Sequence, residues 1–400
     1  MSLFHLVLKS LRQHALSTWV TALSIALAGG LLMSVWVVKT QSSQTFTNIT
    51  GGFDAVLGAR GSKLQLVLNA IYHLESSPGN LAWQDYLDLA ARPAVQHAIP
   101  LAVGDNYLGY RIVGTVTNLF TDIEVEPGRK LVPAAGRVFN AGYREATLGS
   151  FAAQRLRLKV GDTFQPYHGL IFNPADQHEE TYVVVGVLEP SNSPMDRVIW
   201  IPLEGVQNMA GHDPKTATDI SAVLVKLRTP VAGQQLETLY NRQGNRLTLA
   251  WPIGTIMAQL FDKIGWFDRV LAIVAYLVAA VATGSILASI YNSMNERRRD
   301  FAILRALGAR RFTVFATIIL ESTVIAALGM AIAFAIYLAI MSGAANVIRA
   351  QTGVVLNPFA WHPVMLWAPL GMIAAAALAG VVPAFKAYRT DVASNLTPVS

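Results

Sequence analysis

Residues 293–311, SMNERRRDFAILRALGARR, form a strongly basic segment between two long apolar stretches. Six arginines stand there against two acids, Glu296 and Asp300. From Glu296 to Leu307 no residue breaks a helix, and Gly308 is a typical stop signal. The segment therefore predicts a short helix that connects two membrane-spanning helices.

This helix is expected to be amphipathic. At helical spacing Phe301, Leu304 and Gly308 share one face, Ile303 and Leu307 lie beside it, and the charged residues cover the rest. Such a helix could rest on anionic lipid. Alternatively, its apolar face docks into a groove of a cytoplasmic protein.

The apolar stretches on both sides belong to a membrane protein. The chain of 400 residues is 53% hydrophobic and only 14% charged, whereas soluble chains carry about 25% charged residues. A spanning helix needs roughly 20 apolar residues. We expect four spans, at 17–38, 270–292, 315–340 and 364–385. The first is too long for the apolar region of a signal peptide and is interpreted as an uncleaved anchor.

Charge gives the topology. Residues 1–16 contain Lys9 and Arg12 without an acid, and their apolar spacing predicts a short amphipathic helix on the membrane surface. The tail, 386–400, is also basic, whereas 40–266 holds 18 bases and 20 acids. By the positive-inside rule, both termini and 293–311 are cytoplasmic, and 40–266 and the 341–363 loop face the other side. The net charge of +6 is thus a topological signal, and no nucleic-acid partner is expected.

Residues 40–266 are long and polar enough to fold around their own core. The part before residue 100 is expected to be mainly helical, and strands rich in Val, Ile and Tyr follow. Helices are expected at 62–75, 83–91, 149–157 and 232–242, and strands at 107–117, 181–188, 197–201 and 220–228. This mixture predicts an α+β extracytoplasmic domain, in one or two subdomains.

Motifs for catalysis are missing from the sequence. Cysteine is absent, which excludes thiolate chemistry, and no G-x-x-x-x-G-K-[ST] phosphate loop occurs. His168, Asp176, His178, Glu179 and Glu180 share one polar stretch, which we interpret as a solvated loop in preference to a weak divalent-metal contact. We expect a non-enzymatic chain without a metal or cofactor of its own.

Two other features attract a functional interpretation. The segment 51–63, GGFDAVLGARGSK, is rich in glycine and contains Arg60 and Lys63. Its last part, 58–63, is interpreted as a structural turn in preference to a nucleotide site, and the whole segment could form a ligand or partner contact. Glu321 is the lone acid of the third span. A lipid-facing carboxylate there would cost several kcal/mol, so we expect it to face the protein interior or to be protonated.

The 293–311 segment resembles the E-R-R-x-[ED]-[FIA]-x-[IL]-L-R-A-[LI]-G-A motif of FtsX/MacB-like ABC permeases, the mechanotransmission (type VII) class that also includes LolC. Glu321 and Gly329 match the acid and glycine of the next span in this family. The tail from Pro383 to Leu396 resembles the P-A-x-x-A-x-R…P-x-x-x-L ending, with Val392 in place of the second proline. The RLRLKVGD and YVVVGV segments and the one-plus-three order of spans also agree with the family.

The resemblance implies a permease whose partner is a cytoplasmic ABC ATPase that binds ATP and Mg. The coupling helix seated on that ATPase would comprise Glu296, Arg297, Arg298, Arg299, Phe301, Ile303, Leu304, Arg305, Leu307 and Gly308. Glu321 would act in intramembrane coupling. A homodimer in the bacterial inner membrane is the simpler expectation, with a heterodimer as the alternative. Membrane lipid, a periplasmic binding protein, an adaptor or an outer-membrane channel are further candidate partners.

Several functions remain open at this level. The first is ATP-driven movement or extraction of a drug, peptide, lipoprotein or other periplasmic ligand. The second is an FtsX-like scaffold that activates a cell-wall hydrolase and transports nothing. A metal-linked transport system and an unrelated secondary transporter are weaker alternatives, because the histidines are scattered and charge is scarce within the spans.

Overall fold

The computed structural model describes residues 3–209, 218–296, 303, 305–306 and 308–389. The chain divides into two compact units. The helical unit comprises Met1–Gln41, Ile264–Ala345 and Asn357–Ser400. The sheet unit comprises Ser42–Lys263 and Asn346–Leu356. The large domain between the first and second spans is thus joined by a second, short segment from much later in the chain.

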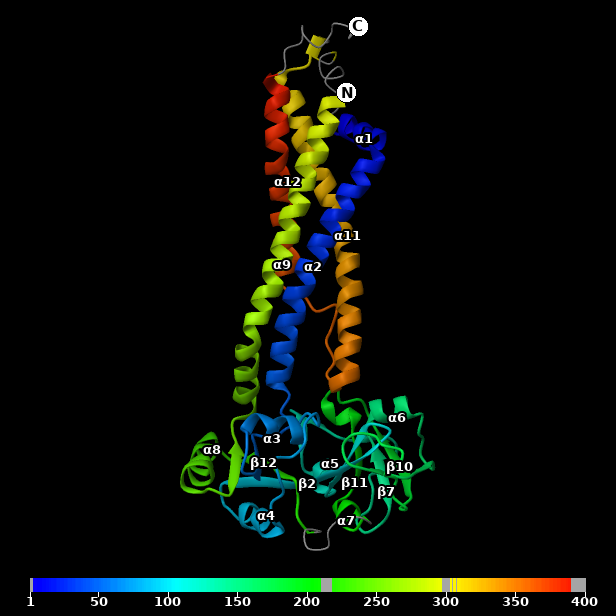
Figure 1. Ribbon diagram of the computed structural model, residues 1–400, viewed down its shortest axis with the longest axis vertical. Helices are drawn as coiled ribbons and strands as arrows, with labels where there is room; N and C mark the ends of the chain where they lie inside the picture. Colours follow the sequence, from blue (N-terminus) through cyan, green and yellow to red (C-terminus); the bar gives the residue numbers. More distant parts are fainter. Residues whose placement is uncertain (1–2, 210–217, 297–302, 304, 307, 390–400) are drawn as a thin grey trace. The chain divides into compact units, whose positions relative to one another are not determined.

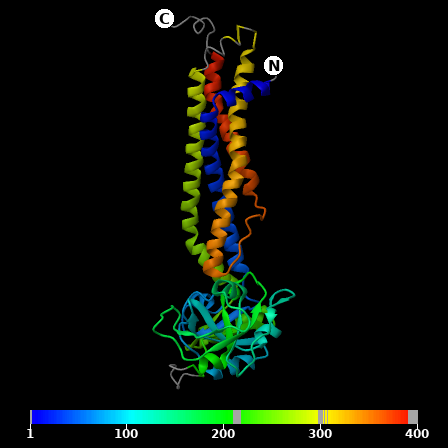
Figure 2. The same cartoon turned by 90° about the vertical axis from the view of Figure 1, so that its right-hand side faces the viewer.

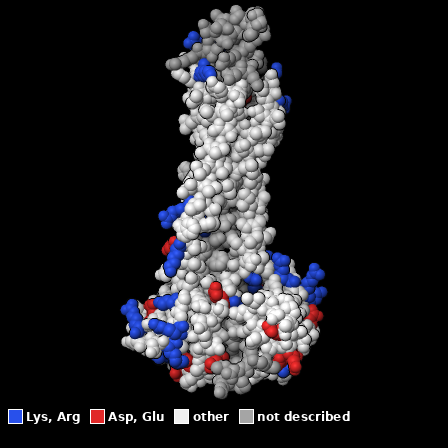
Figure 3. Space-filling model, in the orientation of Figure 1, with Lys and Arg blue, Asp and Glu red and all other residues white. Residues whose placement is uncertain are grey.

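Four helices are long and apolar enough to cross a membrane within the described residues. They are α2 (Ala15–Asn48), α9 (Ile253–Glu296), α11 (Arg311–Thr352) and α12 (Val364–Arg389), preceded by the short α1 (Leu3–Gln13). In two perpendicular views these helices run side by side (Figures 1 and 2). Lys, Arg, Asp and Glu are scarce along their middle part on the face in Figure 3. Each spanning helix includes the apolar stretch expected from the sequence, and α2, α9 and α11 extend well beyond it.

Close packing in the helical unit centres on α2. Of its apolar stretch 61% is buried, compared with 17% for α9 and 22% for α12. A Cβ atom on Gly29 would lie 2.5 Å from the Sδ atom of Met330, and one on Gly329 would lie 2.7 Å from the carbonyl oxygen of Ala22. These glycines let the backbones of α2 and α11 approach closely, which is how helices pack where lipid removes the hydrophobic driving force.

The sheet unit is built on one mixed sheet of eleven strands. The main path runs β13-β1-β12-β2-β3-β11-β7-β10-β6, with β8 paired to β10 and β9 paired to β2. The pairs β3/β11 and β7/β10 are parallel, and the others are antiparallel. The strands are β1 (Ala55–Ala59), β2 (Val95–Tyr107), β3 (Tyr110–Thr115), β6 (Pro133–Gly136), β7 (Glu145–Leu148), β8 (Thr163–Phe164), β9 (Tyr167–His168), β10 (Tyr182–Leu188), β11 (Ile199–Pro202), β12 (Ala222–Leu227) and β13 (Leu247–Ala250), with β4 (Glu124–Glu126) and β5 (Arg129–Lys130) forming a separate hairpin.

The long strand β2 belongs to both halves of this sheet. Its first half pairs with β12 and its second half with β3. One hydrophobic core spans the two halves and contains residues from β1 through β13, including Leu57, Ile112, Val184 and Leu249, all fully buried. Short helices flank the sheet: α3 (Lys63–Ala70), α4 (Trp83–Ala90), α5 (Asn118–Thr121), α6 (Ser150–Leu156), the 3₁₀ turn η1 (Pro194–Arg197), α7 (Leu203–Gln207), α8 (Pro230–Glu237) and the π-helical turn η2 (Thr238–Gln243).

The two helices expected before residue 100 are present as the shorter elements α3 and α4, but β1 and the first residues of β2 also lie there. One expectation is wrong. The 341–363 segment is not all loop, because α11 continues through Thr352. The residues that follow are anchored to the sheet unit: Gly353 has φ +78°, and a Cβ atom there would lie 2.9 Å from the carbonyl oxygen of Ser193. The Arg349 guanidinium lies 5.6 Å from the ring centre of Phe151.

Candidate functional sites

The expected coupling helix lies largely outside the described residues. This holds for Arg297, Arg298, Arg299, Phe301, Leu304 and Leu307, and α9 is described only as far as Glu296. Of the remainder, Ile303 is exposed, and the Gly308 N–H donates to the Arg305 carbonyl (3.0 Å). Gly308 has φ +97°, the left-handed conformation in which glycine commonly follows a helix. The helix itself stays a prediction.

Glu321 is buried within the helical unit. Only 7% of the residue is exposed, and its Oε1 accepts a hydrogen bond of 2.6 Å from the Ser10 hydroxyl of α1. The next residue, Ser322, is fully buried, and a Cβ atom on Gly380 of α12 would lie 2.6 Å from its Oγ. Glu321 therefore lies where α11 contacts both the N-terminal helix and α12.

An aromatic cluster joins the end of α2 to the start of α9 inside the sheet unit. The ring of Phe46 stacks on Tyr72 with centroids 5.4 Å apart and contacts Phe261 at 5.8 Å. The Tyr72 hydroxyl donates to the carbonyl of Phe46 and to that of Ile49 (3.1 Å). Burial raises the pKa of Tyr72, so the phenol remains a donor at neutral pH. It caps carbonyls that the end of α2 leaves without intrahelical partners.

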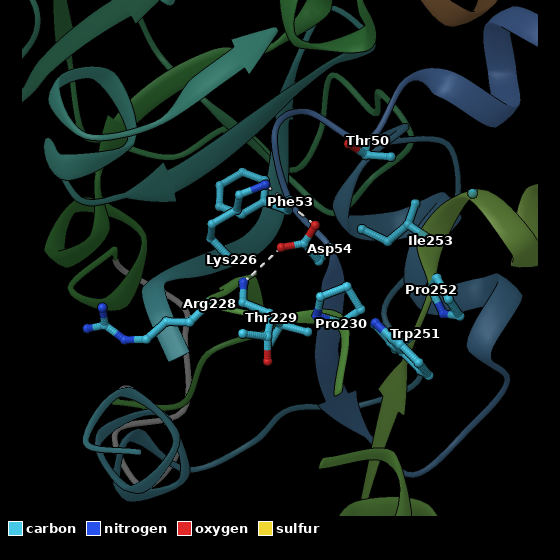
Figure 4. A pocket seen from close by; sticks show the side chains of 12 residues that line it. Thr50, Phe53, Asp54, Lys226, Arg228, Thr229, Pro230, Trp251, Pro252 and Ile253 are labelled. Atoms are coloured by element: carbon cyan, nitrogen blue, oxygen red, sulfur yellow. Dashed lines mark hydrogen bonds and ion pairs between the residues drawn. The ribbon is translucent and has the colours of Figure 1, made fainter. Parts of the chain in front are cut away.

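A cavity of about 350 Å³ lies beside this junction (Figure 4). Asp54 is the acidic residue that lines this cavity. The Asp54 Oδ2 atom accepts a hydrogen bond from the Leu227 N–H (2.8 Å), and the Oδ1 atom lies 3.4 Å from the Lys226 ammonium. The Ile253 N–H, at the start of α9, donates to the Asp54 carbonyl (3.3 Å). Asp54 thus ties β12 and α9 to the chain that follows α2, and its contacts fit a structural role better than a catalytic one.

The middle of the glycine-rich segment 51–63 forms β1 between β12 and β13, and residues 60–62 connect β1 to α3 without regular structure. The two bases singled out from it make contacts inside the sheet unit. The Arg60 guanidinium donates to the Leu247 carbonyl (3.3 Å), and the Lys63 ammonium forms a 2.5 Å ion pair with Glu237. These contacts favour the structural interpretation, and a partner contact through either base stays a prediction.

His73 is an unusual histidine of the sheet unit. It is 8% exposed, has φ +53°, and lies edge-on to the ring of Trp200 at 5.7 Å. Among the described residues neither ring nitrogen has a hydrogen-bond partner. Burial first, and then the charges of Arg111 and Arg197, lower the pKa of His73 to about 3. The imidazole is therefore neutral at physiological pH and acts as an apolar core ring.

Sequence reasoning named two members of one side-chain cluster, with a weak divalent-metal contact as the alternative, but missed the third. His168 and His178 belong to the stretch interpreted as a solvated loop, but both meet Asp105 of β2. Asp105 is fully buried and far from them in sequence. The pairing of β2 with β9 brings His168 next to Asp105. Because β9 has only two residues, no strand pattern in the sequence could predict it.

Two family profiles match the chain. The profile of the MacB-like periplasmic core domain matches residues 18–239, more than half of the chain, and that of the FtsX-like permease C-terminal region matches residues 272–392. The chain belongs to the MacB/FtsX family of ABC transporter permeases. This assignment agrees with the resemblance found in the 293–311 segment and with the order of one span, a mixed α/β domain and three further spans.

Individual relatives of the permease are distant. It is 24% identical over 201 residues to an uncharacterised ABC transporter permease found in two strains of Mycobacterium tuberculosis, a match that covers 50% of this chain and 48% of the relative. It is also 24% identical over 193 residues to the macrolide export ATP-binding/permease protein MacB of Rhodopirellula baltica, covering 45% of this chain and 26% of that protein. The permease thus spans about half the length of the first relatives, and less of MacB.

Solved structures give matches of low overall similarity. The periplasmic region of MacB from Actinobacillus actinomycetemcomitans is 15% identical, with a TM-score of 0.36, and the match covers 54% of this chain and 97% of that one. The extracellular domain of the noncanonic ABC-type transporter YknZ from Gram-positive bacteria is 16% identical, with a TM-score of 0.32, and the match covers 49% and 99%.

Proposed function

We propose that this permease couples ATP hydrolysis by a separate ATPase subunit to motion of its sheet unit. The sheet unit would lie outside the bacterial inner membrane and would move or extract a substrate there, such as a drug, peptide, lipoprotein or other ligand. Membership of the family implies an ATPase partner. The chain is proposed to act as a homodimer, with both termini in the cytoplasm.

The continuity of α2 and α9 carries this proposal. Both helices run from the helical unit into the sheet unit without interruption, α2 across Gln41–Ser42 and α9 across Lys263–Ile264. Inside the sheet unit, the aromatic cluster of Phe46, Tyr72 and Phe261 holds the two helix ends together. Because a helix resists compression and bending, a continuous helix is suited to carry displacement along the chain from one unit to the other.

Transport through the bilayer is not required by this mechanism. Glu321 is the one acid or base between Arg311 and Arg349 in the sequence, and it is buried against Ser10. Polar groups that could line a charged pathway are therefore scarce in the third span. We propose that Glu321 acts instead in coupling, at the contact of α1 with α11, and that the 293–311 segment seats on the ATPase.

Purification from native membranes tests the partnership. A tagged full-length permease should recover an ABC ATPase at roughly one copy per permease in mild detergent. A variant with Phe301→Asp and Leu304→Asp should lose the ATPase, whereas Tyr143→Ser, in the exposed part of the sheet unit, should retain it. Recovery of no ATPase, even after crosslinking, would overturn the proposal. A cell-wall hydrolase recovered with the ATPase would replace transport by the scaffold function.

The orientation can be tested with single cysteines, because the chain has none. Tyr143→Cys in the sheet unit and Ala306→Cys beside Gly308 both replace exposed residues. A membrane-impermeant maleimide should label Tyr143→Cys in intact spheroplasts and Ala306→Cys only after permeabilisation. The opposite pattern would invert the proposed topology.

A further inference from the structure

Three potential metal ligands lie together near the C-terminal end of β2. Asp105 lies directly opposite His168 in the antiparallel pairing of β2 with β9. The chain then turns back, so that the His178 N–H donates to the Pro166 carbonyl (2.9 Å). This return places the His178 imidazole on the same carboxylate. Backbone pairing, and not the flexible reach of long side chains, therefore brings the three groups together.

Their spacing fits a coordination shell. The Nε2 atom of His178 lies 3.2 Å and the Nδ1 atom of His168 lies 3.4 Å from the Oδ1 atom of Asp105. One ligand atom from each of the three residues lies within 4.8 Å of the other two. Bonds of about 2.0–2.1 Å in tetrahedral geometry separate neighbouring ligand atoms by about 3.3 Å. Small side-chain rotations would thus suffice to place an ion between them.

Burial makes this cluster unlike a surface group of acids. Asp105 is fully buried, the His178 side chain is 6% exposed, and the His168 side chain is 55% exposed. A buried carboxylate is costly unless a cation or several hydrogen bonds compensate it. The exposed edge of His168 leaves the cluster open to solvent on one side, where a fourth ligand such as water could complete the shell.

Nearby hydrogen bonds fix the chain around the cluster. The His168 N–H donates to the Asp176 carbonyl (2.7 Å), and the Asn106 side-chain amide donates to the Gly169 carbonyl (2.9 Å). The first bond joins β9 to the chain before His178, and the second joins β2 to the residue after His168. Ligands held by such supporting bonds lose little freedom when an ion binds.

We propose that Asp105, His168 and His178 form a binding site for a divalent transition-metal ion of the zinc class. Two imidazoles and one carboxylate suit zinc and its neighbours, whereas calcium and magnesium prefer shells made of oxygen alone. The bound ion crosslinks β2 to β9 and to the chain between β9 and β10, so metal binding stiffens this part of the sheet unit. The site is independent of the ATP-driven coupling proposed above.

Metal binding to the full-length permease tests the site. The protein is purified in detergent through a histidine-free tag, stripped with a chelator and titrated with Zn²⁺ by calorimetry, with bound zinc measured by mass spectrometry after dialysis. The expected result is one tight ion per chain. His168→Ala, at the solvent-exposed ligand, should weaken the affinity at least tenfold. His97→Ala, on the same strand but outside the cluster, should bind as the unchanged protein does.

Two further readouts guard against adventitious binding. Co²⁺ in place of Zn²⁺ should give the intense visible absorption of a four-coordinate site, which His178→Ala should abolish. Zn²⁺ should raise the melting temperature of the unchanged protein and not that of His168→Ala. If zinc binds His168→Ala and the unchanged protein equally, or if neither binds stoichiometrically at micromolar zinc, the cluster is only a hydrogen-bonded group and the proposal fails.

Discussion

Replacing Tyr72 by phenylalanine should loosen the end of α2 without disturbing the aromatic packing around it. The ring stack on Phe46 is retained, and the change removes only the hydroxyl that donates to the carbonyls of Phe46 and Ile49. One hydroxyl proton is shared between two acceptors, so we count one net hydrogen bond, about 0.5–1.5 kcal/mol. The half-buried carbonyls left behind add to this, for a total of about 1–2 kcal/mol.

Hydrogen exchange measures this loss directly. The amides of the last turn of α2, including the Ile49 N–H that donates to Thr45, should exchange about 5–30 times faster in Tyr72→Phe. Tyr143→Phe, at an exposed tyrosine of the same unit, should leave them unchanged. In the assembled complex Tyr72→Phe should also lower ATPase turnover while the ATPase stays bound. Unchanged protection at residues 45–49 would refute the role given to the hydroxyl, and unchanged turnover would refute the coupling role of this junction.

Three further predictions follow from other parts of the chain. Glu321→Gln keeps an acceptor for Ser10 but removes the ionisable carboxyl group, so ATPase turnover in reconstituted complexes should fall several-fold while assembly is retained; unaltered turnover would count against coupling through Glu321. Phe301→Asp combined with Leu304→Asp should weaken ATPase binding by at least a factor of ten, because a carboxylate in an apolar groove costs several kcal/mol, and retained binding would contradict the coupling assignment. The lowered pKa of His73 means that the unfolded chain binds a proton more readily below about pH 6.5. The free energy of unfolding of the sheet unit should therefore decline on acidification, by up to about 1.4 kcal/mol per pH unit towards pH 3. In His73→Asn this decline should be shallower, and asparagine tolerates the positive φ at this position. Chemical denaturation at a series of pH values measures both proteins.

The membrane architecture was readable from the sequence because its physical signals are local. Four apolar stretches, of which only the third contains an acid or base, and arginines gathered in one loop need no tertiary information. The helices nevertheless extend beyond the apolar stretches. α11 reaches Thr352 because its last turns pack against the sheet unit, where apolar composition is no longer the deciding factor.

The sheet was harder to predict because its strands depend on distant partners. β1 is a five-residue strand inside a glycine-rich segment, and its pairing with β12 and β13 decides its structure. β2 contains Pro100, Gly104 and several polar residues, which hide a long strand shared by two half-sheets. Asp105 is far in sequence from His168 and His178, so the cluster of these three residues becomes visible only once β9 is paired with β2.

The points at which the chain passes from one unit to the other differ in how they respond to an inserted residue. Three of the four crossings, at Gln41–Ser42, Lys263–Ile264 and Ala345–Asn346, fall inside uninterrupted helices, and only Leu356–Asn357 lies in a non-helical segment. Inserting one residue in a helix turns everything beyond it by about 100° and advances it by about 1.5 Å. An insertion at a helical crossing therefore changes the phase of every later residue of that helix, whereas an insertion at the fourth crossing changes the phase of no helix.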